Sequence, residues 1–146
     1  MIRLIAHRGN YKGKNLFEEN KPDYILKAIE KGYDVELDIW NIDNKLYLGH
    51  DAPVHEIEVN FLVAQKDKFW CHAKNLEVVA VLKNLDVNWF WHESDKITLT
   101  SKGNIWPYID IFLDGAVVNQ PTKQSKYWTE KLYLTMNFYG ICSDEF

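Results

Sequence analysis

The sequence has few cysteines and no long apolar run, and each shortage excludes a class of protein. Only Cys71 and Cys142 are present. Their wide separation fits no metal-binding cysteine motif, and it is typical of free core thiols in a reduced compartment. No apolar run approaches the roughly 18 residues of a membrane-spanning helix. The first ten residues, "MIRLIAHRGN", hold too short an apolar run for a secretory signal. We therefore expect a cytoplasmic protein with no membrane span.

Repeats, low-complexity tracts and clusters of like charge are also missing. The 17 Lys and Arg residues are scattered and the net charge is −4. We expect no nucleic acid partner, because binding to a phosphate backbone needs a concentrated basic surface. The 146 residues, 47% hydrophobic and 26% charged, indicate one globular domain spanning 1–146 with a sizeable core.

Short runs rich in β-branched and aromatic residues recur along the chain and predict strands. These runs cover residues 2–7, 33–40, 45–50, 68–74, 87–93, 96–101, 115–120 and 139–145. Helical patterns lie between the early runs, at 21–31, at 75–85 and, more weakly, at 56–65. After residue 85 helical periodicity is scarce, and residues 121–138 hold one short helix at most.

The alternation of strands and helices predicts parallel β/α units and an α/β fold. A complete eightfold β/α barrel usually needs about 250 residues and rarely fewer than about 200, so 146 residues are too few for one. We predict a compact TIM-type (β/α) barrel in which several outer helices are reduced to loops. An open α/β sheet is the alternative.

Two carboxylates stand two residues apart in the apolar run "VELDIW", as Glu36 and Asp38. Side chains alternate along a strand, so both project from one face, and burying them unpaired costs several kcal/mol. Other polar residues follow predicted strands at positions where β/α folds place their sites. The set His7, Arg8, His50, Asp51, His72 and Lys74 would meet Glu36 and Asp38 at one barrel mouth.

The segment from "AHRGN" through "FEENKPDY" to "YLGHD" resembles the N-terminal signature of the glycerophosphodiester phosphodiesterase family, within the phospholipase-C-like phosphodiesterase superfamily. The matching positions, in order and in spacing, are His7, Arg8, Glu19, Asn20, Glu36, Asp38, His50 and Asp51. The C-terminal "YGICSDEF" is similar to the last strand of that family.

The resemblance implies a metal-dependent phosphoric diester hydrolase that acts on a small glycerol-type phosphodiester. It makes His7 and His50 the general base and general acid, in an order that the sequence leaves open. It makes Glu36 and Asp38 ligands of one divalent cation, Mg²⁺ or Ca²⁺. The remaining roles it implies are phosphate binding by Arg8 and Lys74 and supporting contacts from Glu19, Asn20 and Asp51.

The third strand departs from the family pattern, which has Glu-x-Lys where this chain has His72 and Lys74. If His72 is a ligand, the softer donor set favours Mn²⁺ or Zn²⁺ over Ca²⁺. Alternatively, water takes that place. Without a cation, Glu36 and Asp38 would repel each other. We therefore expect Asp38→Asn to leave the metal-free protein equally or more stable.

Two other functions stay open. One is cleavage of a lipid headgroup by a phospholipase or sphingomyelinase D-like activity, although no hydrophobic loop or basic patch supports membrane docking. The other is a catalytically degenerate phosphodiester-binding protein. Residues 52–59 and 102–110, the latter with Trp106 and Tyr108, are candidate specificity loops. A homodimer would cover exposed aromatic surface.

Overall fold

The structure is a computed structural model that describes residues 2–122 and 135–146. Within these ranges it is a mixed α/β protein, which confirms the α/β part of the predicted fold class. The helices are α1 (Pro22–Glu30), α2 (Val59–Ala64) and α3 (Leu76–Leu82). The strands are β1 (Arg3–His7), β2 (Asp34–Ile42), β3 (Lys45–Leu48), β4 (His55–Ile57), β5 (Phe69–Ala73), β6 (Asn88–Phe90), β7 (Ile97–Leu99), β8 (Ile105–Pro107), β9 (Val117–Asn119) and β10 (Gly140–Ser143).

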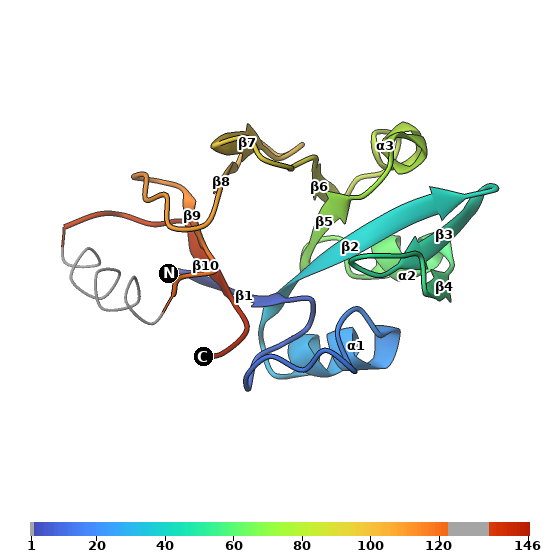
Figure 1. Ribbon diagram of the computed structural model, residues 1–146, viewed down its shortest axis with the longest axis horizontal. Helices are drawn as coiled ribbons and strands as arrows, with labels where there is room; N and C mark the ends of the chain where they lie inside the picture. The colour runs from blue at the N-terminus through green and yellow to red at the C-terminus, as the bar shows by residue number, and fades with distance from the viewer. Residues whose placement is uncertain (1, 123–134) are drawn as a thin grey trace.

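Six strands run parallel in the order β6, β5, β2, β1, β10 and β9. The nine-residue strand β2 is central to this order (Figure 1). Its first part pairs with β1 and β5, and from Ile39 onward it also pairs antiparallel with β3, which in turn pairs with β4. The middle of β2, with Glu36 and Asp38, therefore lies beside the carboxyl ends of β1 and β5.

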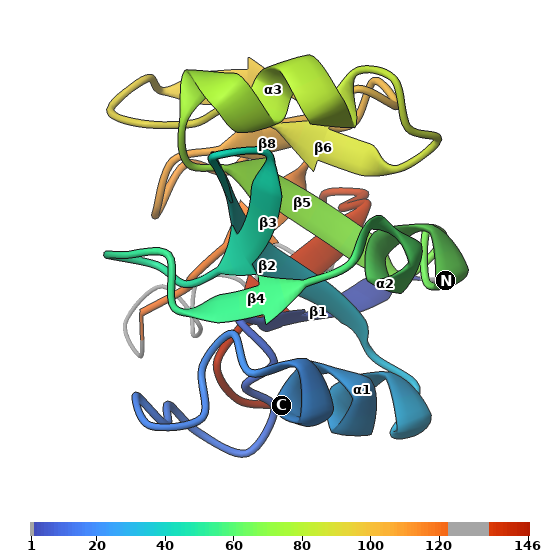
Figure 2. The same cartoon turned by 90° about the vertical axis from the view of Figure 1, so that its right-hand side faces the viewer.

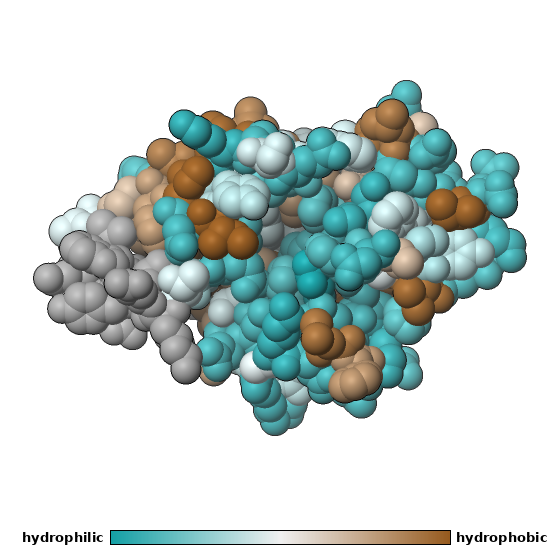
Figure 3. Space-filling model, viewed as in Figure 1, coloured by the Kyte–Doolittle hydropathy of each residue, from teal (hydrophilic) through white to brown (hydrophobic). Residues whose placement is uncertain are grey.

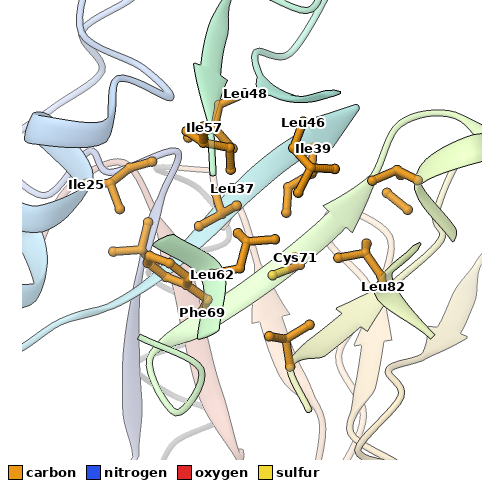
Figure 4. Packing of buried hydrophobic residues seen from close by; sticks show 14 of the residues in the cluster. Ile25, Leu37, Ile39, Leu46, Leu48, Ile57, Leu62, Phe69, Cys71 and Leu82 are labelled. Carbon is orange, nitrogen blue, oxygen red and sulfur yellow. The ribbon is translucent and has the colours of Figure 1, made fainter. Parts of the chain in front are cut away.

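The outer face of this sheet packs against the helices. Figure 2 shows α1, α2 and α3 on the side of the molecule that carries β2 and β5. Leu37 and Ile39 of β2 point into this layer, where they meet Ile25 of α1, Leu62 of α2 and Leu82 of α3 (Figure 4). The strand alternation consequently turns the carboxylates of β2 to the opposite, inner face.

A second buried cluster fills the inner face. It consists of Ile5, Trp70, Phe90, Trp106, Val117 and Cys142, one residue from each of β1, β5, β6, β8, β9 and β10. The ring of Trp106 lies 4.5 Å from that of Phe90 and 5.7 Å from that of Trp70. The sheet therefore curves, and Figure 1 shows the strands arranged in a ring with the β7–β8 hairpin between β6 and β9.

Backbone pairing does not close this ring within the described residues. β7 and β8 form a separate two-stranded sheet. The hairpin is linked to β6 by the Ser101 N–H, which donates to the Trp89 carbonyl at 2.7 Å, and to β9 by the Asn119 side chain, which donates to the Pro107 carbonyl at 3.1 Å. The α/β class is thus established, whereas a TIM-type barrel is not confirmed.

Most predicted elements are present with slightly different ends. The predicted helix at 56–65 begins later, because residues 55–57 pair with β3 as β4. β8 lies in a segment that was predicted only as a loop. The helix considered for 121–138 falls largely on residues 123–134, outside the described ranges. Cys71 and Cys142 are buried free thiols, as expected. In the described chain, every helix is too short or too polar to cross a bilayer.

Candidate metal and acid–base site

The turn after β1 brings Arg8 over β2. Arg8 adopts a left-handed backbone conformation (φ 53°) and is followed by Gly9 (φ 87°). The Arg8 N–H donates to the Glu36 carbonyl at 2.8 Å and also lies 3.3 Å from Glu36 Oε2. The guanidinium donates through NH1 to Glu19 at 3.0 Å. This turn fixes Arg8 directly above the carboxylates of β2.

Asp38 is the most deeply buried carboxylate of the site, with 1% of its side chain exposed. Its Oδ2 accepts from the Asn20 amide at 2.9 Å and lies 3.2 Å from Arg8 Nε. Its Oδ1 lies 3.2 Å from His72 Nδ1 and 3.6 Å from Lys74 Nζ. Burial raises the pKa of Asp38, but His72, Arg8 and Lys74 together outweigh it and hold the pKa well below its ordinary range.

His72 approaches both carboxylates through one ring nitrogen. Its Nδ1 lies 3.2 Å from Asp38 and 3.7 Å from Glu36. Its Nε2 lies 2.9 Å from the His92 carbonyl, so it carries the proton, and the ring stacks on Phe90 at 5.0 Å with planes 10° apart. Burial lowers the pKa of His72, yet the neighbouring carboxylates of Asp38 and Glu36 outweigh this effect and raise the pKa to about 9. In the absence of a cation the ring is therefore an imidazolium at neutral pH.

The same three residues fit a divalent cation. One ligand atom from each of Glu36, Asp38 and His72 lies within 4.8 Å of the others. Asp38 Oδ1 is buried, and no described residue forms a hydrogen bond with it. A cation bound to His72 Nδ1 in place of its proton would also give Asp38 Oδ1 a partner, because metal ligation uses the deprotonated nitrogen of imidazole. The donor set of two carboxylates and one imidazole suits first-row divalent metals.

His7 ends β1 and is oriented by the last strand. Its Nδ1 lies 2.8 Å from Asp144 Oδ1, and its Nε2 lies 3.9 Å from Glu36 Oε2. Burial raises the pKa of Asp144, but the hydrogen bond and charge of His7, together with Asn10 and Lys14, outweigh it and lower the pKa. The fully buried Asn10 donates to Asp144 at 2.8 Å and to Glu19 at 3.0 Å. Asp144 and Asn10 thus hold the His7 ring by its Nδ1 edge.

His50 reaches the site through a tight turn. Gly49 has φ 150°, and a Cβ at this position would lie 2.0 Å from the Ala52 carbonyl oxygen. The Trp40 indole donates to the Gly49 carbonyl at 2.6 Å. His50 Nδ1 lies 2.7 Å from Asp51, whose side chain is 95% exposed. The turn positions His50, and Asp51 pairs with it in solvent.

These groups line one cleft of about 510 Å³. His7, Arg8, Glu36, His50 and His72 contribute its polar wall. Trp106, Tyr108, Ile109 and Pro121 contribute an apolar wall. The structure therefore brings both predicted acid–base histidines to one cavity with two of the three predicted metal ligands.

Lys74 has a different place from the one its predicted role requires. It does not line the cleft, and its Nζ faces Asp38. This geometry favours Lys74 as a charge partner of Asp38 over the predicted phosphate contact. Arg8, in contrast, both lines the cleft and faces Asp38.

Sequence reasoning missed three residues that complete the site. Asp144 and Asn10 orient His7, and the His92 carbonyl orients His72. Asp144 lies inside the family-like "YGICSDEF" segment, which could have indicated it. His92 is a lone histidine after an aromatic strand and Asn10 is an asparagine in a loop, and neither gave a comparable signal.

Comparison with known proteins adds no assignment: no family model, curated protein or solved structure matches this chain. The resemblance to glycerophosphodiester phosphodiesterases thus stays a prediction, carried by the residues quoted above.

Proposed function

We propose that this protein is a metal-dependent phosphodiesterase that hydrolyses a small glycerol-type phosphodiester by two-histidine acid–base catalysis. One observation carries the proposal. Two imidazoles, His7 and His50, each with Nδ1 against a carboxylate, line the same cleft as Glu36 and His72. We also infer that the curved sheet is a TIM-type barrel with reduced helices, which the inner cluster from six strands supports.

The paired carboxylates leave Nε2 of each ring to exchange a proton with the substrate. A partly buried carboxylate stabilises an imidazolium more than an exposed one does, since water screens the exposed charge. Asp144, beside His7, is 18% exposed, whereas Asp51, beside His50, is 95% exposed. We therefore assign His7 as the base that deprotonates the attacking hydroxyl or water, and His50 as the acid that protonates the leaving alcohol.

Arg8 and the metal ligands act on the phosphate. Arg8 engages Glu19 through NH1 and faces Asp38 through Nε, which leaves NH2 to donate to a phosphate oxygen. A divalent cation held by Glu36, Asp38 and His72 would supply Lewis-acid stabilisation of the charge that develops on the phosphate. Mg²⁺, Ca²⁺ and Mn²⁺ are the candidates.

The test is hydrolysis of bis(p-nitrophenyl) phosphate and of a glycerophosphodiester, with Mg²⁺, Mn²⁺, Ca²⁺ or chelator. We expect cation-dependent turnover, and His7→Ala and His50→Ala should each lower kcat by about 10²-fold or more. His55→Ala is the matched control, because His55 lies on β4 and does not line the cleft. Turnover that survives chelator would refute the proposal, and binding without turnover would favour the degenerate binding protein.

The partner and location predictions stay open. The face in Figure 3 is largely hydrophilic, with apolar residues gathered beside the grey atoms and in smaller groups elsewhere. The homodimer and the cytoplasmic location stay predictions.

A further inference from the structure

The surroundings of His72 determine which of its nitrogens faces the carboxylates. Its Nε2–H donates to the His92 carbonyl at 2.9 Å, and the flat face of the ring packs on Phe90. The ring is 16% exposed, so it is enclosed on several sides. Rotating the ring would break a partly buried hydrogen bond and a stacked contact. Nδ1 is therefore held toward Glu36 and Asp38 before any ligand arrives.

The segment that supplies the His92 carbonyl is itself braced. The His92 ring, 8% exposed, places Nδ1 2.6 Å from Asp95 Oδ2. The other oxygen of Asp95 accepts from the Glu93 N–H at 2.9 Å. Asp95 thus ties the His92 side chain to the following backbone and fixes the carbonyl that orients His72. A partner that fixes the tautomer and orientation of an imidazole is typical of histidine ligands to metals.

We propose that His72 binds the cation through Nδ1 and makes this site selective for a first-row transition metal, Mn²⁺ in the first instance, over Ca²⁺, with Asp95 as a positioning residue for that ligand. This inference rests on the proposed cation site and specifies its chemistry. Beyond the cluster itself, it draws on Asp38 Oδ1, which is buried, has no hydrogen-bond partner in residues 2–122 and 135–146, and lies 3.2 Å from His72 Nδ1.

The selectivity follows from ligand type and ligand number. Ca²⁺ takes six to eight oxygen ligands in flexible arrangements, and imidazole nitrogen contributes little to it. Transition metals accept imidazole readily together with carboxylates. A buried set of two carboxylates and one imidazole is therefore poor for Ca²⁺ and suitable for Mn²⁺. Changing His72 to a carboxylate should reverse this order of preference.

The test is titration of the whole protein with Mn²⁺ or Ca²⁺ alone, by calorimetry, together with pulsed EPR of the Mn²⁺ form. We expect Mn²⁺ to bind about tenfold or more tightly than Ca²⁺, and one imidazole nitrogen to couple to the Mn²⁺ spin. His72→Glu should lower the Mn²⁺ preference by about tenfold or more and abolish the nitrogen coupling. Asp95→Asn should retain the coupling but weaken Mn²⁺ binding by about tenfold. Asp43→Asn, in the exposed β2–β3 turn, is the control and should change neither.

The outcomes separate this inference from the proposed function. Equal or tighter binding of Ca²⁺, or a wild-type Mn²⁺ spectrum without nitrogen coupling, overturns the inference while leaving a cation-dependent enzyme possible. Selective Mn²⁺ binding with nitrogen coupling but no hydrolysis upholds the inference and overturns the proposed function. Absence of any cation binding overturns both. If His72→Glu fails to fold, the wild-type spectrum and the Asp95→Asn affinity still decide.

Discussion

Asp38→Asn should destabilise the metal-free protein, contrary to what the repulsion between two carboxylates suggested from sequence. In the structure the Asp38 carboxylate lies within 3.2 Å of Arg8 Nε and His72 Nδ1 and 3.6 Å from Lys74 Nζ. The carboxamide keeps the size of the side chain but removes its charge. Two partly buried cations, on Arg8 and Lys74, then lose their shared anion.

The magnitude follows from the cost of breaking a buried ion pair. Removing one partner of such a pair costs about 3–5 kcal/mol, because the other charge stays buried without compensation. His72 relieves part of this cost by releasing its proton, and Asn20 retains a hydrogen bond to the carboxamide oxygen. We therefore expect a loss near the lower end, about 3 kcal/mol. At about 2–4 °C per kcal/mol, the melting temperature should fall by roughly 6–12 °C.

The assay is urea and thermal unfolding of wild type and variant in chelator at neutral pH. Asp43→Asn is the control, since Asp43 is an exposed turn residue with φ 49° that asparagine also tolerates. The folded-state pKa of Asp38 is lowered, so its contribution is present above the unfolded pKa of about 3.9 and is lost as pH falls below it. The difference between wild type and variant should shrink in acid.

A variant that equals or exceeds wild type in stability at neutral pH would refute this reasoning. Such a result would mean that Glu36 and Asp38 repel each other more than the neighbouring cations attract them. A fall equal to that of Asp43→Asn would likewise show that the ion-pair geometry around Asp38 contributes nothing.

Three further predictions concern neighbouring residues. Lys74→Met should lower the free energy of unfolding in chelator by about 1–3 kcal/mol, whereas Lys45→Met, at an exposed lysine, should lower it much less. Equal effects in urea unfolding would contradict the pairing of Lys74 with Asp38. The pKa of His72 is raised to about 9. In chelator, His72 should therefore contribute fully to the free energy of unfolding below pH 6.5, and this contribution should be lost as the pH rises to 9. His72→Gln should remove this pH dependence from unfolding curves measured across that range. Gly49→Ala should force the turn before His50 to move, since its Cβ would lie 2.0 Å from a carbonyl oxygen, and it should reduce turnover or lower the melting temperature; an unchanged enzyme would contradict the geometry.

The strands and the inward face of β2 could be predicted because each depends on local pattern. Alternation in "VELDIW" placed Glu36 and Asp38 on one face, and the structure has them buried on the inner side of β2. β8 was not predicted because Gly103 and Pro107 indicate a loop, whereas the packing of Trp106 against Phe90 stabilises a strand there. Residues 55–57 pair with β3 despite a helical pattern, since tertiary pairing outweighs weak propensity.

The charge balance of the site could not be predicted, because it depends on contacts between distant strands. The sequence placed Arg8 and Lys74 near the site but did not show that both face Asp38. It likewise did not show that the His92 carbonyl fixes the tautomer of His72. These relations depend on distances of a few ångströms, which patterns of residue types do not encode.

The pairing of His7 with Asp144 has a consequence for how the site forms during folding. The two residues are 137 positions apart in the sequence, and the strands that carry them, β1 and β10, are adjacent and parallel. Contacts of such long range form late and slow folding, because a large loop must close before they stabilise the chain. A ribosome must therefore synthesise residue 144 before β1 gains this neighbour. The segment with Glu36 and Asp38 is synthesised earlier, and the Asp144 contact of His7 becomes available only with β10.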